Sequence, residues 1–215
     1  IVRLSHDSSM DGQRHRGKIR SQPSGGTSGL NPGRITIIRG CMFSGKTTEL
    51  LDRLDARRPN SVALFKHVVD RRYGDDAVTT HDGHACHAVS IATAAELMRQ
   101  MPPDAVVVGL DEAHFFDLNL PRVLTDLSAR GVEVFVTTLD LDSWGRPFRV
   151  DAELSAAADV SITKYGTCAR CGRRADHTQR LTPIVAGRMV GGPESYEPRC
   201  RECWRPPPEP PPSGE

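Results

Sequence analysis

Residues 40–47 read Gly-Cys-Met-Phe-Ser-Gly-Lys-Thr, a full match to the pattern GxxxxGK(S/T). In this pattern the backbone amides curl around the phosphates of a nucleotide, the lysine reaches the β- and γ-phosphates, and the final hydroxyl ligates Mg²⁺. The sequence therefore predicts that this loop binds ATP together with Mg²⁺, with Thr47 as one metal ligand. The residues expected to contact the phosphates are Gly40, Ser44, Gly45, Lys46, Thr47 and Thr48.

Two consecutive carboxylates, Asp111 and Glu112, follow the apolar run at residues 105–110. A carboxylate at the tip of a buried strand faces the phosphate loop across the sheet, so we expect Asp111 to hold Mg²⁺ through water. Glu112 leaves the strand and can face the acceptor, where it would act as general base on an attacking hydroxyl. Alternatively, Glu112 only caps a helix predicted over residues 118–127.

Four of the six cysteines form two CxxC pairs, with residues 172–199 between them. Each CxxC turn presents two thiolates, and two such turns complete a closed, tetrahedral, structural zinc site. The separation exceeds the usual range of a zinc ribbon, so a substantial loop is expected between the pairs. The alternative is a redox role, which needs only one CxxC pair near the start of a helix. The predicted zinc ligands are Cys168, Cys171, Cys200 and Cys203.

The elements around the phosphate loop predict the fold class. The β-branched run at residues 35–38 indicates a buried parallel strand, and the apolar spacing over 48–54 indicates a helix. This order places the phosphates at the N-terminus of a helix, where its dipole favours negative charge. We therefore expect an α/β protein of the P-loop, RecA-like kind, with five or six mostly parallel strands and flanking helices.

The composition divides the 215 residues into four parts. Residues 1–33 and the proline-rich residues 205–215 have no hydrophobic periodicity, so both are predicted to be disordered. Between them we expect a P-loop, ATP-binding domain at residues 34–163 and a small, zinc-ribbon-like domain at residues 164–204.

The charge and hydropathy exclude several classes of protein. The net charge of +1 gives no indication of a nucleic-acid or membrane partner. No apolar run reaches the ~18 residues of a membrane span, and residues 1–33 lack the apolar segment of a secretory signal. We therefore expect a cytoplasmic protein whose cysteines stay reduced.

Residues 111–114 read DEAH, which is also the acidic box of one group of helicases. Translocation of that kind needs two nucleotide-binding domains, and this chain is too short to supply the second. The nearly neutral charge also argues against a groove that follows a phosphate backbone. A nucleic-acid-dependent P-loop ATPase is kept as the alternative function.

The motifs over residues 34–204 resemble, in order, the tetrameric, zinc-containing (type II) thymidine kinases. The phosphate loop of that family usually reads Gly-Pro-Met-Phe-Ser-Gly-Lys, so Cys41 stands here in place of proline. The family's Asp-Glu-x-Gln-Phe-Phe segment is similar to residues 111–116, with His114 in place of glutamine. Further similar blocks are Lys66, Asp70-Arg71-Arg72-Tyr73, Thr80-His81-Asp82, Leu139 to Asp142, Arg146-Pro147-Phe148, Thr178-Gln179-Arg180, and Gly191-Gly192 with Tyr196.

The resemblance implies transfer of the γ-phosphate of ATP to the 5′-hydroxyl of thymidine, and of deoxyuridine too. It also implies a homotetramer, feedback inhibition by thymidine triphosphate (dTTP), and a lasso loop between the cysteine pairs that closes over the base. Lys46, Arg72 and Glu112 would be the catalytic residues, and the backbone of residues 187–190 would read the base edge. The side chains expected at the nucleoside are Met42, Asp70, Phe115, Leu139, Trp144, Thr178, Val190 and Tyr196.

Three departures from the family bear on these expectations. Where bacterial relatives commonly read Asp-Phe-Arg, residues 142–144 read Asp-Ser-Trp, so the aromatic residue is displaced by one position. His114 is expected to change the pH response, and Cys41 brings an oxidisable thiol close to the phosphates. Residues 81–87 contain three histidines and Cys86. They could form a second metal cluster, but the resemblance favours a solvated loop after a β-hairpin.

Overall fold

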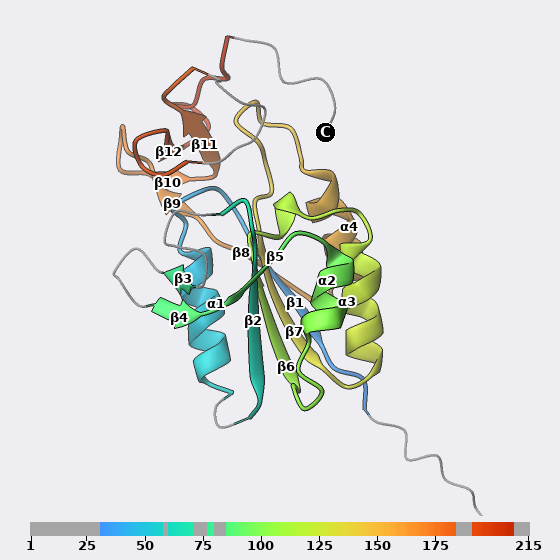
Figure 1. Cartoon of the computed structure of the whole chain (residues 1–215). Coiled ribbons are helices and arrows are strands. Elements are labelled where there is room, and N and C mark those ends of the chain that lie inside the picture. Colours follow the sequence, from blue (N-terminus) through green and yellow to red (C-terminus); the bar gives the residue numbers. More distant parts are fainter. Residues whose placement is uncertain (1–30, 58–59, 71–76, 80–84, 184–190, 209–215) are drawn as a thin grey trace, which may run out of the picture.

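The computed structural model describes residues 31–57, 60–70, 77–79, 85–183 and 191–208. Within these residues, six strands form one sheet in the order β5-β2-β6-β7-β1-β8, and every neighbouring pair in it is parallel. The predicted α/β fold class with a mostly parallel sheet is confirmed (Figure 1). The strands of this sheet are β1 (Ile35–Arg39), β2 (Val62–His67), β5 (Val89–Ile91), β6 (Val107–Asp111), β7 (Glu133–Thr138) and β8 (Val160–Thr163).

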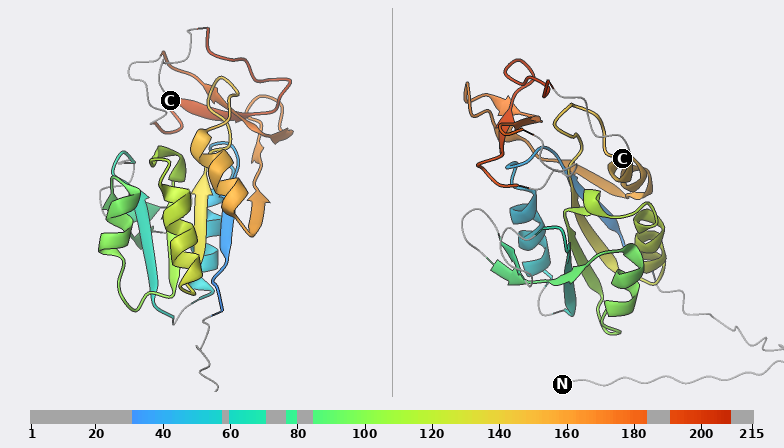
Figure 2. Two further views of the ribbon diagram at one scale, coloured as in Figure 1. Left: turned by 90° about the vertical axis from the view of Figure 1, so that its right-hand side faces the viewer. Right: turned by 45° about the horizontal axis from the view of Figure 1, so that its top comes forward.

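Helices cover both faces of the sheet (Figures 1 and 2). Helix α1 (Lys46–Asp55) packs on one face, together with the hairpin of β3 (Ala77–Thr79) and β4 (Ala85–His87). The other face carries α2 (Ala94–Gln100), α3 (Leu120–Ala129) and α4 (Arg149–Ala157). The helix predicted over residues 118–127 is α3, which begins two residues later because Pro121 is preorganised for the first helical turn.

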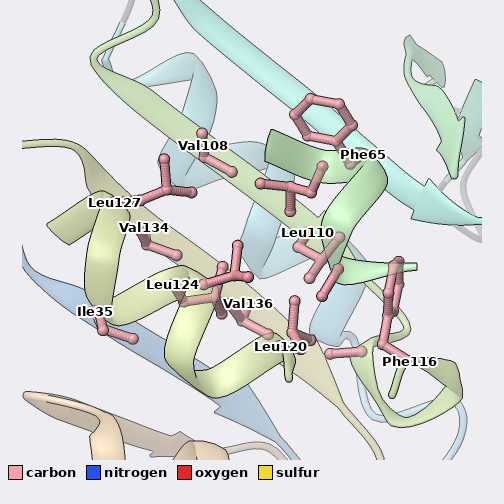
Figure 3. Packing of buried hydrophobic residues seen from close by; sticks show 14 of the residues in the cluster. Ile35, Phe65, Val108, Leu110, Phe116, Leu120, Leu124, Leu127, Val134 and Val136 are labelled. Atoms are coloured by element: carbon pink, nitrogen blue, oxygen red, sulfur yellow. The ribbon is translucent and has the colours of Figure 1, made fainter. Parts of the chain in front are cut away.

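Alternation along the strands builds two hydrophobic cores. Ile35 and Ile37 of β1 point to the α2–α4 face, while Ile38 points to α1. Strand β7 repeats this pattern, because Val134 lies in the larger core shown in Figure 3 and Phe135 lies beneath α1. Each fully buried aliphatic or aromatic side chain contributes about 1.5–3 kcal/mol. Burial on both faces therefore fixes the carboxyl ends of the strands relative to one another.

Two short antiparallel ribbons lie above these carboxyl ends (Figure 1). One pairs β9 (Gly166–Thr167) with β10 (Arg174–Ala175), and the other pairs β11 (His177–Arg180) with β12 (Tyr196–Arg199). The predicted boundary between residues 163 and 164 falls directly after β8. Of the segments predicted to be disordered, residues 1–30 and 209–215 lie outside the described residues. The division into domains stays a prediction.

No helix in the described part of the chain combines the length and the apolar character that crossing a bilayer requires.

Candidate active site

Glycines at both ends of the phosphate loop allow its backbone to curl. Gly40 has φ of 141°, and a Cβ at this position would lie 2.2 Å from the carbonyl oxygen of Lys164. Gly45 has φ of 78° and directly precedes α1. Residues with a side chain rarely adopt either backbone conformation, so both positions require glycine. The loop thereby directs its amides and the N-terminus of α1 toward one point, as an anion site requires.

Two side chains of the loop form hydrogen bonds with the loop's own backbone. Lys46 Nζ donates to the carbonyl oxygen of Cys41 at 2.7 Å, and Ser44 Oγ donates to the same oxygen at 2.8 Å. Lys46 is buried although it carries a charge. A buried ammonium group is costly unless it is paired, so its position favours an anionic ligand in the loop.

Oxygen ligands suited to Mg²⁺ meet beside the loop. Thr47 Oγ1 lies 3.3 Å and 3.4 Å from the two carboxylate oxygens of Asp111, which also accepts a hydrogen bond from Thr137. Asp70, Asp111 and Glu112 each place a carboxylate oxygen within 4.8 Å of the others. Mg²⁺ prefers such oxygen ligands, at about 2.0–2.1 Å. The donor set therefore fits the predicted magnesium site, with Asp70 in this acidic cluster.

Glu112 turns out of the sheet directly after β6. Its φ is 55°, a left-handed conformation that is uncommon for a residue other than glycine, and Thr137 Oγ1 accepts a hydrogen bond from its backbone N–H at 3.0 Å. Strained backbone of this kind clusters at active sites. The Glu112 side chain makes no capping hydrogen bond to the short helix η1 (Ala113–Phe115) that follows. The alternative, that Glu112 caps the helix predicted over residues 118–127, is wrong, because the N-cap of α3 is Asn119.

Thr137 is not among the residues identified from the sequence, although its hydroxyl donates to the Asp111 carboxylate and accepts from the Glu112 backbone N–H. Its position at the carboxyl end of a β-branched run, 134–138, was the available signal. A local pattern does not show that β7 lies between β6 and β1, and this neighbourhood alone brings Thr137 to Asp111 and Glu112.

The four cysteines of the CxxC pairs converge above the sheet. Their sulfur atoms all lie within 4.8 Å of one another, and the Cys171 and Cys200 sulfurs are 3.6 Å apart. Four sulfurs at ~2.3 Å from a tetrahedral Zn²⁺ are separated by about 3.8 Å, so the donor set fits zinc. Cys86 is not part of this cluster. It lies half-buried in β4, and His81 and His84 lie outside the described residues.

Comparison with known proteins agrees with this geometry. Residues 33–204 match the family described as thymidine kinase. The chain belongs to the thymidine kinase family. A thymidine kinase of a Rhodothermus species is 39% identical over 181 residues, which cover 83% of this chain and 84% of the relative. A thymidine kinase of Bdellovibrio bacteriovorus is 37% identical over 178 residues, which cover 81% and 86% of the two chains.

Among solved structures, the ATPase domain of G40P aligns with a TM-score of 0.39 at 14% identity and covers 60% of this chain and 68% of that chain.

Several residues predicted to bind the nucleoside form an apolar cluster. Met42, Leu139 and Tyr196 are buried against one another, with the half-buried Phe43 and Phe148 beside them. This cluster joins the phosphate loop, the end of β7 and the β12 ribbon. It supplies an apolar wall of the kind that small-molecule sites use.

The structure describes most of the other residues predicted at the nucleoside. Thr178 Oγ1 accepts a hydrogen bond from the Met42 backbone N–H at 3.0 Å, so it holds the phosphate loop. Phe115 lines a cavity of about 420 Å³ between residues 114–118 and 142–150. Ser143 is fully buried, while Trp144 is half-buried beneath the Arg146 guanidinium, 5.4 Å from its ring centroid. Arg72 and Val190 lie outside the described residues.

Cys41 is only 1% exposed, and its sulfur lies 3.6 Å from the carbonyl oxygen of Ala175. Burial raises the pKa of the Cys41 thiol, although the nearby Lys46 ammonium acts in the opposite direction. The thiolate is the reactive form of cysteine. A buried thiol with a raised pKa therefore argues against ready oxidation of Cys41, a question that the sequence leaves open.

Cys41 should react slowly with iodoacetamide at pH 8 in the folded protein, about tenfold or more below Cys86, because its thiolate fraction and its access are both reduced. Trypsin separates the two thiols, since residues 40–46 and 73–99 form peptides with one cysteine each. Mass spectrometry of these peptides after timed labelling gives both rates. Equal rates would contradict the prediction, and labelling in guanidinium should remove the difference.

Proposed function

We propose that the chain transfers the γ-phosphate of ATP to the 5′-hydroxyl of thymidine, and also to that of deoxyuridine. The observation that carries this proposal is the position of Glu112. Its carboxylate lies within 4.8 Å of those of Asp70 and Asp111, and Asp111 contacts Thr47 of the phosphate loop. These contacts support a general base close to the phosphate site.

The loop amides and Lys46 would bind the β- and γ-phosphates, and Thr47 and Asp111 would hold Mg²⁺. When bound, Mg²⁺ neutralises charge on the phosphate oxygens. Glu112 would accept the proton of the attacking hydroxyl, a step worth about 10²–10⁴-fold in rate. Arg72, by family resemblance, would steady the transferring group from the acceptor side. Most of the acceleration would come from positioning and charge stabilisation, because the transition state of phosphoryl transfer is loose.

The base would pack on the wall of Met42, Leu139 and Tyr196, which the geometry of this apolar cluster supports. Asp70, Phe115, Trp144, Thr178 and Val190 complete the proposed nucleoside site. Trp144 would take the role of the displaced aromatic residue; the alternative is a wider pocket that accepts a broader range of nucleosides. The lasso between the cysteine pairs would close over the base and exclude water.

Zinc in the four-cysteine site, a homotetrameric assembly, feedback inhibition by dTTP and a cytoplasmic location belong to the same proposal. The cluster of four sulfurs supports the zinc site. The other three rest on resemblance to the family and on the sequence.

The test is ADP production by purified protein with ATP and Mg²⁺, measured with and without thymidine. ADP should form only when the nucleoside is present, and deoxyuridine should compete with thymidine more strongly than deoxycytidine does. The opposite result, ADP release that DNA or RNA stimulates and thymidine does not, would replace this proposal by the nucleic-acid-dependent ATPase. Phosphorylation of deoxycytidine at an equal rate would overturn the substrate range alone.

A further inference from the structure

His114 lies in the short helix η1, two residues after Glu112. Its side chain is 0% exposed. The ring is enclosed by Phe115, with centroids 4.1 Å apart, and by Phe148, with centroids 5.0 Å apart. An imidazole fixed in this way has one orientation, so its two nitrogens face fixed neighbours.

One of these neighbours determines the tautomer of the neutral ring. The backbone N–H of Leu139 donates to His114 Nδ1 at 3.3 Å, so Nδ1 acts as an acceptor. A neutral imidazole that accepts at one nitrogen carries its proton on the other. Nε2 therefore carries the proton, and it lies 3.4 Å from a carboxylate oxygen of Glu112.

The backbone of Glu112 is held more firmly than its side chain. Its N–H is fixed by Thr137, but the carboxylate sits at the end of a flexible side chain that is 13% exposed. The 3.4 Å contact does not reach hydrogen-bond geometry in this structure; closed by a small movement, it would hold one carboxylate oxygen and leave the second oxygen for a substrate hydroxyl. The distance of 3.4 Å is longer than a normal hydrogen bond, as is common for catalytic contacts in substrate-free structures.

The other end of the same ring touches the proposed nucleoside wall. Leu139, whose N–H binds Nδ1, packs with Met42 and Tyr196 in the apolar cluster. His114 thus spans the distance between the wall that would hold the base and the carboxylate that would take the proton. Both contacts depend on one neutral ring.

We propose that His114 is a positioning residue: as the Nε2–H tautomer, it orients the Glu112 carboxylate toward the acceptor hydroxyl and ties it to the backbone of Leu139. The inference deepens the proposed function and rests on the assignment of Glu112 as general base. Glutamine can also accept at one atom and donate at another, so it can replace both contacts. Leucine can replace neither.

Kinetics of two variants test this role. His114→Leu should lower kcat about 10–100-fold, part of the 10²–10⁴-fold that a positioned base supplies, with KM for ATP unchanged because the phosphate loop is untouched. His114→Gln should stay within about threefold of wild type, since both hydrogen-bonding positions are kept. In the Glu112→Gln background, His114→Leu should cause little further loss, because residues that act as a unit are not additive. Wild-type kcat in His114→Leu, or full additivity, would overturn the proposal.

A second measurement does not depend on activity. The protein has eight histidines, and ¹⁵N labelling of their rings distinguishes the two neutral tautomers by chemical shift. The signal that His114→Gln removes should show the Nε2–H form. The Nδ1–H form would overturn the proposal, because that ring cannot accept from Leu139. Absence of thymidine phosphorylation in the wild type would instead overturn the proposed function and leave the tautomer result standing.

Discussion

Replacing Glu112 with glutamine should lower kcat for thymidine phosphorylation by about 10²–10⁴-fold, the usual contribution of a general base. The amide has the same size as the carboxylate and keeps an oxygen facing His114 Nε2, but it does not accept the proton. ATP and thymidine should bind with nearly unchanged affinity, because the phosphate loop and the apolar wall are not altered. Steady-state kinetics and calorimetric titration of both ligands make this measurement.

A matched control is Glu133→Gln at the opposite end of the sheet. The Arg57 guanidinium beside Glu133, at 2.6 Å, holds the pKa of that carboxyl below its usual range. Loss of this partly exposed ion pair should cost about 0.2–1 kcal/mol of stability and leave kcat unchanged. Near-normal turnover of Glu112→Gln would remove Glu112 from the mechanism. A parallel loss of kcat in Glu133→Gln would indicate that the effect is one of folding.

Replacing Cys171 with serine should remove zinc and weaken the phosphate loop as well. Cys171 is exposed, so the smaller side chain leaves no cavity, and any loss of stability comes from the metal site. Structural zinc contributes folding free energy directly. In a chain of this size each 1 kcal/mol shifts Tm by about 2–4 °C, so a fall of roughly 10 °C or more is expected.

The effect should reach the phosphate loop because strand β11, next to the four-cysteine cluster, holds it. Thr178 of β11 accepts from the Met42 N–H at 3.0 Å, and β12, which pairs with β11, ends directly before Cys200. Loss of this hydrogen bond should lower ATP affinity about fivefold, given a contribution of about 1 kcal/mol.

The control is Cys86→Ser, the same change at a half-buried cysteine outside the cluster. Zinc content by atomic emission, Tm by calorimetry and ATP affinity by titration should all stay at wild-type values in Cys86→Ser. A Cys171→Ser protein that retains one zinc per chain and its full Tm would contradict the zinc site. One that loses zinc but binds ATP normally would contradict only the link to the loop.

The features that sequence predicts best are those made by residues close together in the chain. The phosphate loop is one, because Gly45 adopts its left-handed conformation within its own turn, with no distant segment against it, and α1 follows at once. The CxxC turns are another, since each presents two thiolates whatever the rest of the fold does. The β-branched runs likewise indicated buried parallel strands, and the sheet confirms them.

Contacts that depend on the order of strands in the sheet could not be predicted from the sequence. Asp70, Asp111 and Thr137 meet because β2, β6 and β7 are neighbours in the sheet, and parallel strands end at one edge. The amino-acid composition of a segment does not indicate which strands will be its neighbours in the sheet. The same holds for Thr178, assigned to the nucleoside by resemblance, whose hydroxyl in the structure holds Met42 of the phosphate loop.

The sequence by itself determined that this chain binds a nucleotide phosphate, that four thiolates can share one metal, and that the two belong to an α/β protein of the thymidine kinase type. Only the tertiary structure decided how the active site is oriented. It directs His114 at Glu112 through the backbone of Leu139, and it buries Ser143 while Trp144 lies under Arg146. The physical reason is that side-chain direction depends on packing against segments distant in the chain, whereas a motif fixes only its own backbone.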